Sequence, residues 1–180
     1  MIKIKLLKKG IYGEEYICKD EFLSINDNNI VLKYIRLMKK IKHIDNEKLI
    51  KNIYKILFEI SIENVDIGNL KVFINNYYKC VKDYKKHMIS LSYNRDSNKC
   101  IIDFYVDILK NKNIDSIRYI LHILYNEKIL KDKYILEWYQ KLDKKSKYMK
   151  SEILKDFMEW LENESSESEC DSDSDDVDSD

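Results

Sequence analysis

The chain has 180 residues with 32 basic and 32 acidic side chains, so its net charge at neutral pH is zero. Residues 162–180 hold ten of the acids and no base, which leaves a body with 32 bases and 22 acids, net +10, joined to a tail of net −10. No stretch approaches the ~18 uninterrupted apolar residues of a membrane-spanning helix. The four cysteines are scattered and form no C-x-x-C pair, so neither a zinc knuckle nor a disulfide framework is indicated.

The first 28 residues show no regular element. Ile2, Ile4 and Leu6 alternate with lysines as in a strand, whereas Gly10 and Gly13 favour a loop. We therefore treat residues 1–28 as an N-terminal cap. The lysines also interrupt the apolar run that a secretory signal needs, so we expect a cytoplasmic protein.

Residues 29–162 have the apolar spacing of amphipathic helices. Asp27, Asn28 and Asn29 provide N-caps for a helix over about 29–43. Asp45 precedes a second helix, whose apolar positions are Leu49, Ile50, Ile53, Ile56, Leu57 and Ile60. After Gly68 and Asn69, a third has its apolar positions at Leu70, Phe73, Ile74, Tyr77, Tyr78 and Val81.

A polar loop is expected at residues 94–98, and four more helices after it. The first two have apolar positions at Ile101, Phe104, Tyr105, Ile108 and Leu109, and then at Ile117, Ile120, Leu121 and Leu124. The last two cover about 132–144 and 150–162. Seven short helices with short connections predict an all-α fold, an α-solenoid of HEAT-like antiparallel helix pairs over 29–162.

Residues 163–180 have almost nothing apolar to bury, so we expect a disordered acidic tail that attracts a basic partner. Three serines in it, Ser166, Ser168 and Ser172, each precede an acid by three residues. This is the spacing that an acid-directed kinase prefers. Phosphorylation at these serines would add further negative charge to the tail.

The sequence contains no pattern of an active site. His43, His87 and His122 are isolated, and neither a glycine-rich phosphate loop nor a G-x-S-x-G elbow is present. We therefore expect a protein that is not an enzyme, with no catalytic residues, no metal and no cofactor. The lysine-rich helices lack the signatures of RNA-binding modules, so a solvated face is the simpler interpretation and RNA a weak candidate partner.

The last third of the chain contains three short patterns rich in aromatic and acidic residues. They are an L-Y-x-E-x-I-L string at 124–130, an I-L-x-W-Y box at 135–139 and an F-x-x-W-L box at 157–161, with Trp160 22 residues after Trp138. Over about 121–180 the chain resembles the two aromatic and acidic boxes that close the C-terminal HEAT domain of eukaryotic translation initiation factor 5, the epsilon subunit of the initiation factor 2 exchange factor, and initiation factor 4G. Lys128, Lys131 and Lys133 stand where the first box of that family tends to be acidic.

The resemblance implies a translation initiation adaptor. Such a domain binds lysine-rich segments of the beta subunit of initiation factor 2 through its acidic end, and other factors, such as factors 3 and 4, through a basic helical face. The carboxylates that the resemblance assigns to partner binding are Glu137, Glu159, Glu162, Glu164, Glu167, Glu169 and Asp171. The box aromatics are Tyr125, Trp138, Tyr139, Phe157 and Trp160; we expect the last four to hold the final two helices together and so position the acids.

Three other functions remain as alternatives. They are a scaffold similar to factor 4G that docks the initiation helicase, a guanine-nucleotide exchange module for factor 2, and a generic RNA-binding helical domain. The additional domains of factor 5 and of the exchange subunit are not in this sequence, so we expect an isolated adaptor domain or a fragment, as in a short viral or divergent member. We expect a monomer with no membrane partner.

Overall fold

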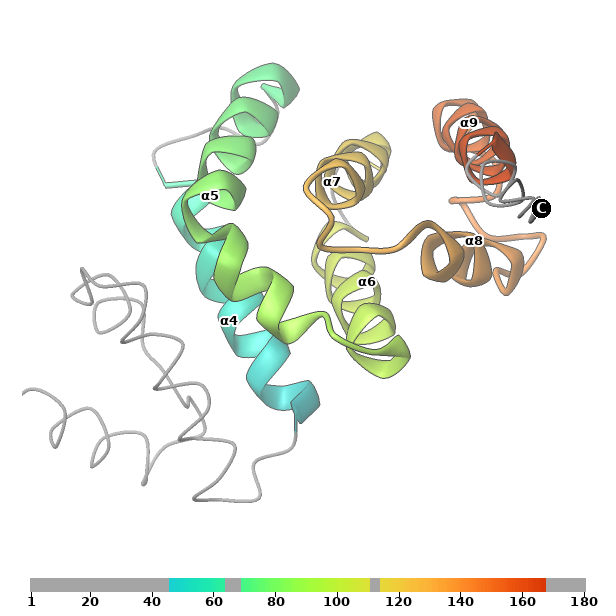
Figure 1. Cartoon of the computed structure of the whole chain (residues 1–180). Helices are drawn as coiled ribbons and strands as arrows, with labels where there is room; N and C mark the ends of the chain where they lie inside the picture. The colour runs from blue at the N-terminus through green and yellow to red at the C-terminus, as the bar shows by residue number, and fades with distance from the viewer. Residues whose placement is uncertain (1–45, 64–68, 111–113, 168–180) are drawn as a thin grey trace, which may run out of the picture.

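The computed structural model describes residues 46–63, 69–110 and 114–167, and within these ranges it contains only helices (Figure 1). The all-α prediction is therefore confirmed. The N-terminal cap and the helix expected at 29–43 lie outside the described residues. The six helices are α4 (Asn46–Ser61), α5 (Leu70–Leu91), α6 (Arg95–Leu109), α7 (Asp115–Asn126), α8 (Asp132–Gln140) and α9 (Glu152–Glu167).

The helices form three antiparallel hairpins that stack side by side, as Figure 1 shows. Within each hairpin the two helices pack on each other: α4 on α5, α6 on α7, and α8 on α9. Between hairpins, α4, α6 and α8 form one layer, whereas α5, α7 and α9 form the other. This is the arrangement of a HEAT-like solenoid, in which each hairpin covers the apolar face of its neighbour. None of the described helices is long and apolar enough to cross a membrane.

The core between α4, α5 and α6 is an aromatic cluster. Tyr54, Phe58, Phe73, Tyr77 and Tyr105 are fully buried, and most of their rings meet edge to face. The hydroxyl groups of Tyr77 and Tyr105 form a hydrogen bond of 2.6 Å. Because burial penalises the phenolate, the pKa of both tyrosines is raised. These side chains fix the crossing of the first two hairpins.

The predicted loop at 94–98 is wrong, because α6 already begins at Arg95. The Asn94 side chain caps the helix by accepting a hydrogen bond from the Ser97 N–H (2.8 Å). Ser97 and Asn98 are buried. The Asn98 amide donates to the carbonyl oxygens of Ser92 (2.8 Å) and Asn94 (2.7 Å) and so keeps both polar groups satisfied. Asparagine is typical of loops, but here the buried Asn98 side chain stabilises the first turn of a helix.

The last two helices also end at other positions than predicted. Helix α8 ends at Gln140, not near 144, because the Asp143 side chain accepts from the Lys145 N–H (2.8 Å) and its carbonyl oxygen from the Ser146 N–H (2.8 Å), which forms a turn. Helix α9 ends at Glu167, beyond the expected limit at 162. Its apolar positions stop at Leu161, but the backbone continues helical through polar residues. Residues 168–180 of the acidic tail lie outside the described part of the chain.

Candidate protein-interaction site

The L-Y-x-E-x-I-L string forms the end of α7 and the turn into α8. The N–H groups of Ile129 and Leu130 both donate to the Leu124 carbonyl oxygen (2.8 and 3.1 Å), and both side chains are buried. The turn requires Lys128 at φ 59°, in the left-handed region. Glu127 accepts a hydrogen bond from the Lys85 ammonium of α5 (2.8 Å). The string therefore closes α7 and sets the position of α8.

The first box lies on α8 and is linked to α6 by an ion-pair network. Both the Nε and the Nη2 of Arg95 donate to the Glu137 carboxylate, and the Lys141 Nζ donates to it at 2.5 Å. The Arg95 guanidinium, and then the Lys141 ammonium, lower the pKa of Glu137 to about 2. Glu137, expected to bind a partner, is thus already held by two cations of the same chain.

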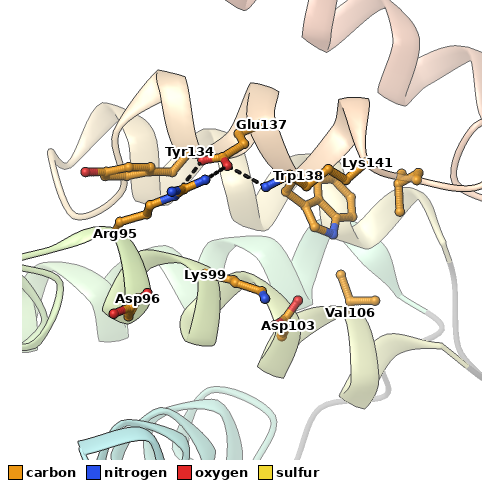
Figure 2. A pocket seen from close by; sticks show the side chains of 10 residues that line it. Arg95, Asp96, Lys99, Asp103, Val106, Tyr134, Glu137, Trp138 and Lys141 are labelled. Carbon is orange, nitrogen blue, oxygen red and sulfur yellow. Dashed lines mark hydrogen bonds and ion pairs between the residues drawn. The ribbon is translucent and has the colours of Figure 1, made fainter.

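Trp138 lies over a groove between α6 and α8, shown in Figure 2. The groove has a volume of about 630 Å³. Its α6 wall carries Asp96, Lys99, Asp103 and Val106, and its other wall carries Tyr134, Glu137, Trp138, Lys141 and Leu142, with Arg95 at one end. The Trp138 ring is half-buried and meets the Tyr148 ring edge to face, with 6.0 Å between the ring centroids. The groove combines an aromatic wall with charged groups.

The second box lies on α9 and faces α7. Phe157 is buried, whereas Trp160 is 37% exposed and stacks on it with 5.8 Å between the ring centroids. The Trp160 ring also meets His122 (5.2 Å) and Tyr125 (5.8 Å) of α7 edge to face. Burial, and the Arg118 charge nearby, lower the pKa of His122. These rings form the aromatic contact between α7 and α9.

The structure therefore distributes the box aromatics over two interfaces. Trp138 contacts Tyr139 and Tyr148, whereas Phe157 and Trp160 contact residues of α7. Tyr139 is close enough to α9 for the charges of Lys155, Glu152 and Glu159 to act on its hydroxyl, whose pKa is raised mainly by burial. Of the four rings expected to join the last two helices, Tyr139 is the one that these interactions place between them.

The acids of α9 are directed to solvent. Glu159, Glu162 and Glu164 are exposed on the second half of the helix. Glu167 and Ser166 belong to the last turn of α9, and the structure does not describe their side chains. The other expected positions, Glu169, Asp171, Ser168 and Ser172, lie outside the described residues.

Sequence reasoning missed the partners of these residues. Arg95 and Glu137 are 42 positions apart, and no local pattern indicates that they meet. The sequence also did not indicate that Asp103 lines the groove, or that His122 belongs to the aromatic contact between α7 and α9. Within the described ranges, no group of three or more histidine, cysteine, aspartate or glutamate side chains could hold a metal ion.

Together, the stacked helical hairpins form an α-solenoid domain, and its last hairpin carries the two boxes. Residues 99–171 match the family model described as W2: eIF4-gamma/eIF5/eIF2-epsilon. The match runs from within α6 through both boxes, and it confirms the resemblance to the C-terminal domain of those factors. This part of the chain is thus a protein-interaction domain of the kind found in translation initiation factors. A comparison with curated protein sequences found no match.

Proposed function

We propose that the protein is a non-catalytic adaptor of translation initiation in the cytoplasm. It binds a lysine-rich segment, such as that of the beta subunit of initiation factor 2, through the acids at the end of α9 and the tail that follows. The observation that carries this proposal is the exposure of Glu159, Glu162 and Glu164 on α9, directly before the acidic residues 167–180 and within or next to the W2 match.

Charge explains how such a surface would bind. Glu159 and Glu162 are three residues apart and so project from adjacent turns of α9. The acidic residues that follow can meet a lysine block in many registers. Because an exposed charge pair contributes only ~0.2 to 1 kcal/mol, the affinity comes from many pairs at once and falls steeply with salt.

A second factor, such as initiation factor 3 or 4, would bind a basic face. The outer side of α5 supports this part of the proposal. Lys71, Lys79, Lys82 and Lys86 are exposed there, and Lys82 lies over the Tyr78 ring at 4.9 Å. Asp83 is the one acidic residue in the sequence of α5.

The test is a binding titration of the full chain with a peptide of eight lysines at two salt concentrations. Because α9 extends to Glu167, the truncation that leaves this helix intact removes residues 168–180. It should weaken binding and leave the melting temperature nearly unchanged, since the segment removed contains almost no apolar side chains. Glu159→Lys with Glu162→Lys should weaken binding further.

The matched control reverses two exposed acids elsewhere, Asp83→Lys on α5 and Glu63→Lys after α4, which changes the net charge equally. If this control weakens binding as much as the α9 pair does, the peptide responds to net charge alone and the proposed site is wrong. If truncation leaves the affinity for lysine unchanged but increases RNA binding, the tail shields the basic body and does not hold the partner.

A further inference from the structure

One carboxylate of the α6–α8 groove makes no direct ion pair. Asp103 lines the groove from α6 and is partly buried; within the described part of the chain its carboxylate has no hydrogen bond or salt bridge, although the charges of Lys99 and Lys51 act on it. Burial raises its pKa above the ordinary value of 3.8, although Lys99 and Lys51 act in the opposite direction. A partly desolvated carboxylate in this situation gains when a cation reaches it.

The other two acids of the groove differ from Asp103. Glu137 is held by Arg95 and Lys141, so its charge is already compensated. Asp96 is exposed and lies in the first turn of α6, where the helix dipole favours a negative charge. Asp103 is therefore the carboxylate of this groove that is best placed to receive a cation from outside.

The wall opposite Asp103 is aromatic. Figure 2 shows Trp138 extending from α8 toward α6, with Asp103 and Val106 across from its ring. Leu142 continues this wall. A thin aliphatic stem can pack on such a surface while its charged end stays at the carboxylate, and a cation close to the indole gains a further attraction from the ring.

From this juxtaposition we infer that the α6–α8 groove is a subsite for one lysine side chain of the partner segment. The ammonium group pairs with Asp103, and the four-carbon stem lies on Trp138. The inference rests on the proposed function, and it adds a contact to the acids of α9 and the tail. We assign the cation to lysine because the proposed partner segment is lysine-rich; a carboxylate also pairs with the planar guanidinium of arginine, so an arginine peptide tests this assignment.

Replacing Lys99 should have the opposite effect on lysine binding to replacing Asp103. It lies one turn before Asp103 on the same wall, so it repels an incoming cation and would attract an anion. Lys99→Met should therefore strengthen the binding of a lysine peptide, and Asp103→Asn should weaken it. An anionic ligand in this groove would respond to both changes in the reverse direction.

The chain has two tryptophans, so a Trp160→Phe background leaves Trp138 as the sole reporter of the groove. A peptide of eight lysines should change the Trp138 emission in this background. Adding Asp103→Asn should lower the affinity about fivefold, as expected for one partly screened pair, and remove the emission change. Lys99→Met should raise the affinity. Asp83→Asn, an exposed acid on α5 that does not line the groove, is the control and should change neither.

The outcomes separate the inference from the proposed function. If the lysine peptide does not bind the full chain at all, both are wrong. If it binds and responds to changes in α9 or the tail, but Asp103→Asn leaves its affinity and the Trp138 emission unchanged, the groove inference alone is overturned. An equal response to a peptide of eight arginines, or a Trp138 response to eight glutamates, would also overturn the assignment to lysine.

Discussion

Glu137 and Asp103 line the same groove in opposite electrostatic situations. Ion pairs with Arg95 and Lys141 lower the pKa of Glu137 from 4.5 to about 2, whereas burial raises the pKa of Asp103 above 3.8. The charge of Glu137 therefore stabilises the fold, and the charge of Asp103 has a cost that a ligand can offset. The sequence alone does not distinguish the two acids.

The pH dependence of stability tests the role of Glu137. Because the folded pKa is lowered, its ion pairs stabilise the protein fully above about pH 4.5, and this stabilisation is lost as the pH falls toward 2. The free energy of unfolding in urea should therefore differ between wild type and Glu137→Gln at pH 6, and the difference should shrink below pH 4.5. Lys141→Met, which removes one of the two cations, should narrow this pH window. A constant difference across the range would show that Glu137 acts through packing.

Trp160 allows a second test at this scale. For a fully buried tryptophan ring, truncation to alanine costs ~3 to 5 kcal/mol of stability. With 37% of the residue exposed, Trp160→Ala should cost only about 2 kcal/mol, mainly from its contacts with Phe157, His122 and Tyr125. Phe157→Ala, at a fully buried position, should cost more. Equal losses in urea denaturation would mean that Trp160 is covered in solution.

At the scale of helices, Asn98 connects two turns that are far apart in the sequence. Its amide group donates to the carbonyl oxygens of Ser92 and Asn94 in the turn between α5 and α6, and its Oδ1 accepts from the Lys131 N–H (3.3 Å) before α8. The position of α8, and with it the groove and the first box, thus depends on a buried polar side chain in α6.

Asn98→Ala removes this connection, and with it the side-chain bonds to the buried Ser92 carbonyl oxygen and to the Lys131 N–H. Each unsatisfied group costs about 1 to 3 kcal/mol, so the variant should lose roughly 2 to 4 kcal/mol of stability. Hydrogen exchange of the Lys131 amide should also accelerate. Asn75→Ala, at an exposed position of α5, is the matched control and should change stability by less than about 0.5 kcal/mol. Unchanged protection of Lys131 would show that Asn98 does not hold the turn.

The sequence predicts the buried side of a helix better than it predicts where the helix ends. The spacing of apolar residues predicts the buried side of each described helix, since Leu49, Ile53 and Leu57 must share one face of α4. Helix ends depend instead on single polar groups. Asparagine and aspartate are typical of loops. The hydrogen bonds of Asn98 and Asp143 decide whether the chain forms a helix or a turn at these positions.

The candidate site was predictable in a similar, partial way. The spacing of the two boxes indicates the surface, and the W2 match confirms the family resemblance. However, the spacing of residues on one helix does not show how far a neighbouring helix covers them, so it does not give the partial exposure of Trp160. Nor does it show that Arg95 reaches Glu137 and leaves Asp103 available in the same groove.

At the scale of the whole molecule, the described hairpins form a linear stack in which each packs mainly on the next. In such a stack, stability is approximately a sum over units and over the contacts between neighbours. The hairpin of α8 and α9 has its main contacts with each other and with α6 and α7. It also carries both boxes and one wall of the groove.

Because of this placement, partner binding depends on whether the hairpin of α8 and α9 is docked on the rest of the domain. In a linear array a hairpin that packs on one neighbour can open without the rest, and among the described helices the hairpin of α8 and α9 packs mainly on α6 and α7. A partner that bridges α6 and α8 binds only when the two are docked, and it therefore stabilises that hairpin by mass action. Part of the binding free energy then offsets the cost of docking α8 and α9. The measured affinity therefore depends on the folding of these two helices as well as on the charges on their surface.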